Sequence, residues 1–419
     1  MDTRATASDD ATTQRFQQKR ERILDAAAQL INRHGVRGMT FVDVAQLVEL
    51  NTTSVTYYFR RKEMLAAAVM ERSIDRLEDV IRDAGALPTP RARVARFIEA
   101  HFEMQARIFQ NLESPVTPLS DIRALGEPYR SELTARYIQA FRKMREFFAP
   151  AVSRQDKLVR TIRAHILMQN IFWLPAWATL YSIEDYPRIS QRLIEILEHG
   201  IAPPDAPWAP HLLEVAPVEL ASTNPGMPEN FARAATSLIN EKGYRGASVE
   251  QIASEINVTK GSFYHHLEAK DELVLECFRR SNARISQVQH AAAASGGTRW
   301  DCLASAIATL LDVQLFSDFP LLRTTALQAL PSDWRDDMLG RSNRLALRFA
   351  GFLIDGITEG TIRAIDPLIA SQAIMTSLNS AYDLRDWIAP VPQQVAISLY
   401  GSTLAHGLFS DPPPILLET

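Results

Sequence analysis

One sequence pattern occurs twice in this chain. Leu30-Ile31-Asn32 with Gly35 after it returns as Leu238-Ile239-Asn240 with Gly243 after it. The offset at the glycines is 208 residues (243 − 35), and it is the same between Lys62 and Lys270. A nearly constant offset means that a module of about 200 residues has been duplicated, because solenoid repeats have periods of roughly 20–50 residues. We therefore expect two domain-sized halves of one kind.

The composition is that of an ordinary globular protein. Of 419 residues, 46% are hydrophobic and 22% charged, and each half is long enough to bury a substantial core. The net charge of −4 excludes a protein that coats nucleic acid through its bulk charge. Any contact with DNA must therefore come from a local patch.

The sequence also predicts a compartment. The first residues, MDTRATASDDATTQ, contain no apolar segment typical of a signal peptide. The longest apolar run, Ile171 to Tyr181, contains Pro175 and is far shorter than the roughly 20 residues that span a bilayer. We expect a cytoplasmic protein with no membrane partner. In that compartment Cys277 and Cys302 are expected as two buried thiols, in preference to a disulfide.

Apolar residues recur at helical spacing almost throughout, which predicts an all-α chain. After a disordered tail at residues 1–14, Ile23, Ala27 and Leu30 line one face of a first helix, which Gly35 is expected to end. Thr40 is suited to N-cap a following helix, 41–48. Between the halves, the repeated prolines of residues 201–226 predict an extended linker, which could reach about 80 Å.

The most specific local signal is the pair of segments Thr40–Phe59 and Ser248–Leu267. Each predicts a short helix, a tight turn and a second short helix, which is a helix-turn-helix. Asn51 and Thr259 are expected to N-cap the second helix of each pair. The inner positions stay apolar in both copies: Val44, Ala45, Val48, Val55 and Phe59 become Ile252, Ala253, Ile256, Phe263 and Leu267.

These residues resemble the TetR-type (tetracycline-repressor) family of bacterial transcriptional regulators. The family pattern has a first helix ending in Gly, a Thr- or Ser-capped helix, an aromatic-rich recognition helix, and a Lys at the start of a fourth helix. The chain supplies Tyr57-Tyr58-Phe59 with Lys62, and Tyr264-His265-His266 with Lys270. Thr56 and Leu267 depart from the family's usual aromatics. The match covers about 50 residues of each copy.

The resemblance implies that each helix-turn-helix is followed by a helical ligand-binding and dimerisation domain. We accordingly expect the domains 15–65 and 66–200 in the first half, the linker 201–226, and the domains 227–273 and 274–419 in the second. In the family, the last two helices form a four-helix bundle with a partner. Here those helices would be Asp156–Tyr181 with Tyr186–Gly200, and Pro367–Asp386 with Pro392–Gly407. The simplest arrangement is an intramolecular pseudo-dimer; homodimerisation of the whole chain is the competing one.

The residues expected to contact double-stranded DNA follow from this geometry. Helix-capping hydroxyls and the two lysines can take phosphates, and outward residues of a recognition helix reach base edges. In the first copy these are Thr40, Thr52, Thr53, Ser54, Thr56, Tyr57, Tyr58 and Lys62; in the second they are Ser248, Lys260, Gly261, Ser262, Tyr264, His265, His266 and Lys270. Because the outward residues differ between the copies, we expect them to prefer different half-sites.

Local charge separates the two copies. Residues 15–65 carry nine Lys/Arg and five Asp/Glu, a net charge of +4, whereas residues 227–273 carry five and seven, a net charge of −2. Since phosphate neutralisation supplies most non-specific affinity, the second copy should bind DNA more weakly. An alternative therefore stays open, in which the protein is a ligand sensor or scaffold, only the first helix-turn-helix binds DNA, and the second serves protein contacts.

An effector site is predicted in the first helical domain. An aromatic cluster with two polar neighbours suits an apolar or aromatic small molecule, although core or interface packing explains the same pattern. Its members are His165, Gln169, Phe172, Trp173, Trp177 and Tyr181. The second half offers Phe316, Phe319 and Trp334 as a comparable set.

Other chemistry is not expected. His265 and His266 are adjacent, and adjacent helical residues point about 100° apart, which disfavours a shared metal ion. The sequence shows no nucleophile–base pair, metal-ligand spacing or phosphate loop, so we predict neither an enzyme nor a cofactor. The expected function is a ligand-responsive repressor that reads an asymmetric operator as a single chain.

Overall fold

The computed structural model describes residues 4–203, 205–215, 229–259, 261, 270–330 and 332–413. All regular secondary structure in these ranges is helical, as predicted. The chain divides into two compact units, residues 1–81 with 107–140, and residues 82–106 with 141–419. Within the described residues, no helix is both long and apolar enough to cross a membrane.

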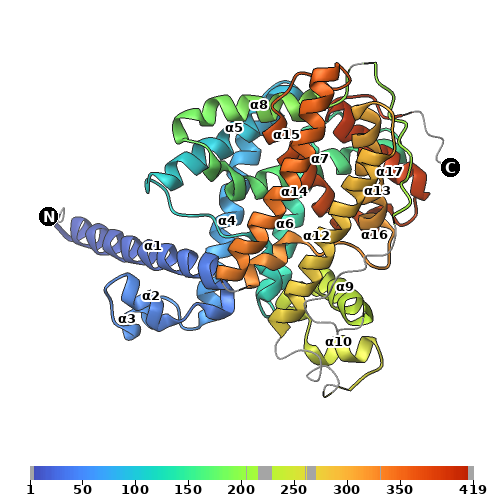
Figure 1. Ribbon diagram of the computed structural model, residues 1–419. Coiled ribbons are helices and arrows are strands. Elements are labelled where there is room, and N and C mark those ends of the chain that lie inside the picture. Colours follow the sequence, from blue (N-terminus) through green and yellow to red (C-terminus); the bar gives the residue numbers. More distant parts are fainter. Residues whose placement is uncertain are drawn as a thin grey trace. The chain divides into compact units, whose positions relative to one another are not determined.

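The first unit begins with four helices, α1 (Arg4–Gly38), α2 (Phe41–Leu47), α3 (Thr52–Tyr58) and α4 (Lys62–Gly85) (Figure 1). As predicted, α1 breaks at Gly35, whose φ of 67° lies in the region that favours glycine. The sequence predicted a disordered tail at 1–14, whereas the structure describes residues 4–14 as part of α1. Those polar residues lack the apolar periodicity that predicts a helix.

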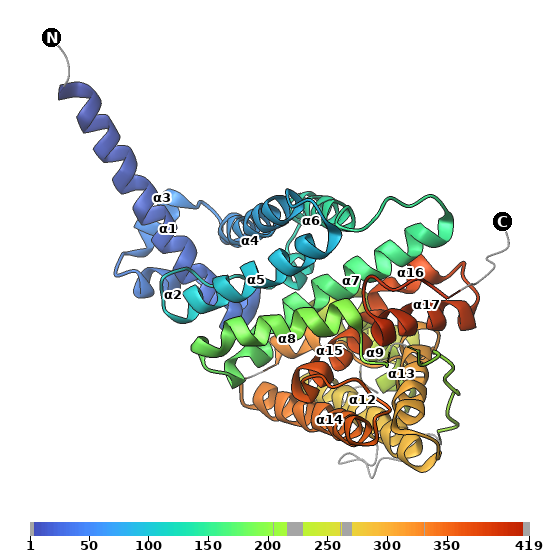
Figure 2. The same cartoon turned by 90° about the horizontal axis from the view of Figure 1, so that it is seen from above.

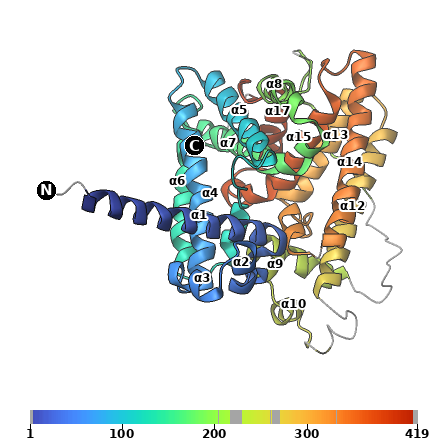
Figure 3. The same ribbon diagram turned by 90° about the vertical axis from the view of Figure 1, so that its left-hand side faces the viewer.

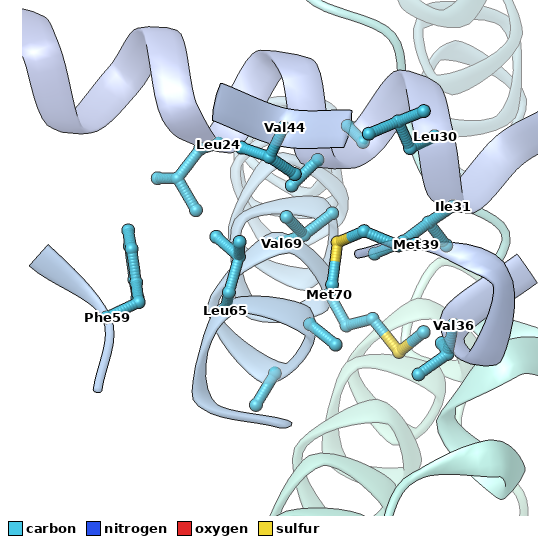
Figure 4. Close-up of a cluster of buried hydrophobic side chains, with 14 of the residues drawn as sticks. Leu24, Leu30, Ile31, Val36, Met39, Val44, Phe59, Leu65, Val69 and Met70 are labelled. Atoms are coloured by element: carbon cyan, nitrogen blue, oxygen red, sulfur yellow. The ribbon is translucent and has the colours of Figure 1, made fainter. Parts of the chain in front are cut away.

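A hydrophobic core holds these helices together (Figure 4). Val44 and Val55 are fully buried, and Phe59 is nearly so, which confirms the inner faces read from the sequence. Met39 and Met70 fill the space beside Ile31 and Val36. The unit is completed by a short 3-10 helix η1 (Leu119–Ala124) and by α6 (Tyr129–Arg145). Ile122, Leu125 and Leu133 join the same core.

The second unit contains the remaining helices of the first half. These are α5 (Pro90–Phe109), α7 (Arg154–Trp177) and α8 (Tyr186–His199), with the short 3-10 helices η2 (Ala178–Leu180) and η3 (Ile183–Asp185) before α8. Ser153 and Asp156 form a capping box that starts α7. The predicted helix Asp156–Tyr181 therefore begins two residues early and ends at Trp177.

The second half repeats this order. Its elements are α9 (Glu229–Gly246), α10 (Val249–Glu255), α12 (Lys270–Ala294), α13 (Arg299–Leu315), η4 (Thr324–Ala329), α14 (Ser332–Glu359), α15 (Pro367–Ser380), η5 (Ala381–Leu384), α16 (Arg385–Ile388) and α17 (Gln393–His406). The long helices α12 and α14 lie side by side (Figure 3). The expected single helix Pro367–Asp386 is divided after Ser380 into α15, η5 and α16. Cys277 and Cys302 are buried free thiols, as predicted.

Helices from the two halves pack together inside the second unit. α7 and α8 lie against α15 and α17 (Figure 2). Leu408 N–H donates to Leu197 O at 2.7 Å, and Ile201 N–H donates to Ala405 O at 2.9 Å. The approach is reciprocal at two glycines that end corresponding helices: a Cβ on Gly200 would collide with the carbonyl of Ala405, and one on Gly407 with the carbonyl of Glu198.

The described part of the predicted linker does not cross open solvent. His211 N–H donates to Ser305 Oγ at 3.2 Å and Leu213 N–H donates to Thr309 Oγ1 at 3.0 Å, so the segment runs along α13. Trp300 Nε1–H donates to Pro207 O at 3.3 Å. The prolines exclude a helix, as predicted, but the segment is held by polar contacts to α13 over these residues.

Candidate nucleic-acid interface

The first helix-turn-helix is built from two capped helices and a tight turn. Thr40 Oγ1 accepts from Asp43 N–H at 3.2 Å and caps α2, while Asn51 Oδ1 accepts from Ser54 N–H at 2.7 Å and caps α3. Both caps were predicted. Between them Glu49 has φ 56°, and Leu50 N–H donates to Ala45 O at 2.9 Å. The turn thus fixes the angle at which α3 leaves α2.

The second copy forms the same turn. Ser248 and Gln251 form a capping box at the start of α10, Asn257 has φ 56°, and Val258 N–H donates to Ala253 O at 2.9 Å. These contacts match those of the first copy at the offset of 208 residues. Asn tolerates a positive φ better than Glu, so this turn is the less strained one.

The predicted base-reading residues of the first copy differ in exposure. Tyr57 is 75% exposed, and Thr52 and Thr53 are also exposed. Ser54, Thr56 and Tyr58 are half-buried, and Thr56 Oγ1 donates to Thr53 O at 2.9 Å within α3. Thr52, Thr53 and Tyr57 are therefore the side chains best placed to reach a groove.

In the second copy only part of the predicted set can be located. Ser248 is half-buried at the start of α10 and Gly261 is exposed. Lys260, Ser262, Tyr264, His265 and His266 lie outside the described residues, and so do the inner residues Phe263 and Leu267. Thr259 is exposed, but the helix that it was expected to cap lies outside the described residues as well.

The two lysines expected at phosphates make backbone contacts. Lys62 Nζ donates to Arg37 O at 2.5 Å, at the end of α1. Lys270 Nζ donates to Tyr244 O and lies 4.1 Å from the centre of the Tyr244 ring. In both copies the lysine ties the start of the fourth helix to the end of the first. Phosphate binding by these lysines stays a prediction, and their position beside the helix-turn-helix is common to both copies.

Sequence reasoning missed an aromatic contact to the recognition helix. Phe16 of α1 lies with its ring centre 4.7 Å from that of Tyr58 and 6.2 Å from that of Tyr57. One turn later the Arg20 guanidinium lies 5.4 Å from the centre of the Phe59 ring. The i, i+4 spacing of Phe16 and Arg20, continuing into Ile23 and Leu24, is the signal that would have revealed this face.

The residues predicted for an effector site are distributed over several environments. His165 is buried, its Nε2 lies 2.9 Å from Ser380 O of α15, and burial lowers the pKa of His165. A neutral ring that donates to a carbonyl across two helices is typical of an interface. Gln169 is half-buried on the same helix. His165 thus joins α7 to α15.

The aromatic residues do not form one wall. Trp177 is buried, with Tyr181 at 6.0 Å and Phe102 at 6.2 Å between ring centres. Phe172 is 38% exposed, and Trp173 packs against the core of the second helix-turn-helix domain. An apolar hollow between α7, α8, α15 and α17 is lined by residues that include Ile166, Ile374 and Leu404, and by none of the predicted set. Effector binding by these six residues stays a prediction.

The comparable set in the second half is also dispersed. Phe319 packs against the core of the second helix-turn-helix domain, with the Arg233 guanidinium 5.8 Å from the centre of its ring. Phe316 ends α13, and Trp334 is 37% exposed on α14. Over the described part of the chain, no three His, Cys, Asp or Glu side chains gather as a metal site would require.

Both helix-turn-helix segments match a known protein family. The family model described as bacterial regulatory proteins, tetR family, matches residues 23–69 and 232–277. The Transposon Tn10 TetC protein of Escherichia coli is 39% identical over 59 residues, which are 12% of this chain and 30% of that protein. The chain thus matches less than a third of that relative's length.

Two further proteins are similar over longer stretches. The HTH-type transcriptional repressor DhaR of Mycobacterium sp. (strain GP1) is 28% identical over 141 residues, 32% of this chain and 69% of that protein. A TetR-family transcriptional regulator from Bordetella parapertussis 12822 has a TM-score of 0.36 and 19% identity, covering 42% of this chain and 92% of that one.

The family matches fall on α1 to α4 and on α9 to α12, the two segments that share the caps, the turn and the lysine described above. Each is followed by the long helices of its own half. The chain thus carries two segments, residues 23–69 and 232–277, that match the model of bacterial regulatory proteins, tetR family.

Proposed function

We propose that this protein is a ligand-responsive repressor that acts as an intramolecular pseudo-dimer on an asymmetric operator. The observation that carries the proposal is the packing of α7 and α8 on α15 and α17. These are the helix pairs that the family resemblance assigns to dimerisation, and they meet here within one chain. The reciprocal approach of Gly200 and Gly407 supports an approximate two-fold relation between the halves.

Polar contacts at this junction support a specific interface. Asn170 Nδ2 donates to Ser377 Oγ at 3.3 Å, and Arg363 donates to Gly200 O at 2.7 Å. Beside this junction, within the second half, the buried Tyr400 Oη–H donates from α17 to Ser377 O of α15 at 2.7 Å. Buried polar groups that find partners across two helices fix one register of packing. A second copy of the chain is not needed to satisfy these groups.

The asymmetry of the operator follows from the two recognition helices. The outward residues Thr52, Thr53 and Tyr57 of the first copy correspond to Lys260, Gly261 and His265 of the second. A Thr and a Lys offer different hydrogen-bonding groups to the major groove, so the two half-sites should differ in sequence. Half-sites one helical turn apart, about 34–36 Å, would suit simultaneous binding.

Release by an effector would act through α4 and α12. Both helices start at a lysine tied to the preceding DNA-binding domain, Lys62 to Arg37 and Lys270 to Tyr244. A small displacement of either helix would change the spacing of the recognition helices and break simultaneous binding. We propose an apolar or aromatic effector, bound in one or both helical domains.

The test is selection of bound sequences from random duplex DNA, with the mass of the complex measured on the same sample. Two unlike half-sites about one turn apart, bound by one chain, would support the proposal. A palindrome bound by two chains would refute it. The alternative, in which the second copy serves protein contacts, is motivated by its net charge of −2. In that case Lys260→Ala with His265→Ala would leave operator affinity unchanged.

A further inference from the structure

The part of α1 that contains Arg15, Phe16, Lys19 and Arg20 forms an arm of the first DNA-binding domain. α1 extends beyond α2 and α3 towards the N-terminus (Figure 1). Phe16 packs on Tyr58 and Tyr57 at the end of the recognition helix. Arg20 lies over the ring of Phe59, which is itself buried. The arm is therefore held beside α3, next to the exposed Tyr57.

The charge of the arm suits DNA. Arg15 and Lys19 are exposed, and four residues on a helix place them on one side, about 6 Å apart along the axis. The acidic side chains that follow Lys19 in α1, Glu21 and Asp25, are bound by Arg72 of α4, at 3.3 Å and 2.6 Å. Their charge is thus compensated within the domain, and Arg15 and Lys19 stay exposed beside them.

The second copy cannot repeat this arrangement. At the offset of 208 residues, Arg15, Phe16 and Lys19 correspond to Thr223, Asn224 and Met227. None of the three can supply a cation or an aromatic ring. The basic and aromatic residues of the arm are thus a sequence feature that the duplicated modules do not have in common.

We propose that Arg15 and Lys19 form a second DNA-binding surface of the first module, which takes backbone phosphates of the duplex beside its half-site. This inference rests on the proposed function as a DNA-binding regulator. The ligand is the phosphate backbone of double-stranded DNA, and Phe16 is a positioning residue that fixes the arm against α3. Phosphate contacts of this kind set register and affinity without reading sequence.

The experiment measures affinity for a mixed-sequence duplex between 50 and 200 mM salt, with the full chain. Each phosphate contact contributes about 0.9 to the slope of log K against log salt, so Arg15→Ala with Lys19→Ala should lower the slope by about 1.8. Across this fourfold range of salt, wild type should then lose about twelvefold more affinity than the variant. Arg15→Lys with Lys19→Arg should keep the wild-type slope.

A matched control is Arg154→Ala with Lys157→Ala, which removes the same charge from exposed positions on α7 and should leave the slope unchanged. Footprinting should show that the arm variant protects fewer nucleotides on one side of the first half-site. An unchanged slope and footprint in the arm variant, with wild type still binding DNA, would overturn this inference alone. If wild type bound no duplex at all, the proposed function itself would fail.

Discussion

Asn240 and Asn32 occupy the same position in the two copies and should differ in what they contribute to stability. Asn240 is 2% exposed; its Nδ2 donates to Leu321 O at 2.9 Å and its Oδ1 accepts from Arg323 N–H at 2.9 Å. The Arg323 guanidinium in turn lies 2.8 Å from Asp383. One amide side chain thus joins α9 to the segment before α14.

The first copy lacks half of this arrangement. Asn32 Nδ2 donates to Val116 O at 3.0 Å, but its buried Oδ1 has no hydrogen-bond partner among the described residues. The reason is visible in the sequence. Pro118 stands where the second copy has Arg323, two residues after the carbonyl that accepts from the asparagine, and proline has no N–H to donate.

The magnitudes follow from these contacts. Asn240→Ala removes two hydrogen bonds and leaves a buried N–H and a buried carbonyl unpaired, at a cost of about 3 kcal/mol. Asn32→Ala removes one hydrogen bond and also removes the Oδ1 acceptor that had no partner. It should therefore lower the free energy of unfolding by only about 1 kcal/mol. The difference of about 2 kcal/mol corresponds to a factor of about thirty in the opening equilibrium.

Native-state hydrogen exchange is the assay, since it resolves each helix where global unfolding of a two-unit chain would not. Amides of α9 should exchange about a hundredfold faster in Asn240→Ala, and amides of α1 about fivefold faster in Asn32→Ala. Pro118→Ala supplies the missing N–H and should raise the cost of Asn32→Ala towards that of Asn240→Ala. Equal effects of the two asparagine variants, or no coupling to position 118, would refute the reasoning.

Three further outcomes are expected. Gly407 has φ 90°, and a Cβ there would collide with the carbonyl of Glu198. Gly360 has φ 74°, but a Cβ there would meet nothing within 4 Å. Gly407→Ala should therefore lower the Tm by several degrees more than Gly360→Ala does. Burial lowers the pKa of His101 from 6.5 to about 4, so the unfolded chain binds the proton at a higher pH than the folded chain does. The free energy of unfolding should therefore fall by about 3 kcal/mol as the pH drops from 6.5 to 4. Urea titrations should show this loss in wild type and not in His101→Gln. Burial also raises the pKa of Cys277 to about 12, so this thiol should react with a thiol reagent only under denaturing conditions, and prompt reaction of the native protein would contradict its burial.

Local features of the fold were predictable because they depend on neighbouring residues. The caps at Thr40, Asn51 and Ser248 follow from side chains that accept a backbone N–H three residues later. The break at Gly35 follows from a backbone angle that suits glycine. These signals, present twice at one offset, were enough to identify the DNA-binding domain and its duplication.

Contacts between distant residues were not predictable from these signals. Nothing near Trp208 indicates that it packs against Gly401, where a Cβ would collide with its ring. His165 was a candidate for an effector, because a histidine beside aromatic residues is equally typical of a pocket and of an interface. The contact of its Nε2 with Ser380 O, more than two hundred residues later, could not be read from the neighbouring sequence.

Under the proposed function, covalent linkage would explain how a second copy with a net negative charge can still contribute to operator binding. Residues 227–273 have a net charge of −2 and no counterpart of the basic arm at Arg15 and Lys19, so this domain alone should bind DNA weakly. Once the first domain is bound, however, the second is held near its half-site at an effective concentration that reaches the millimolar range for short connections. A domain whose own Kd is about 10⁻⁴ M would then be mostly bound. The contacts of Arg323 with Asn240 and with Asp383 would favour this binding. A domain that is held in a fixed orientation loses less conformational entropy when it binds DNA. If the proposed function holds, duplication within one chain would let one copy supply affinity while the other supplies a second sequence preference.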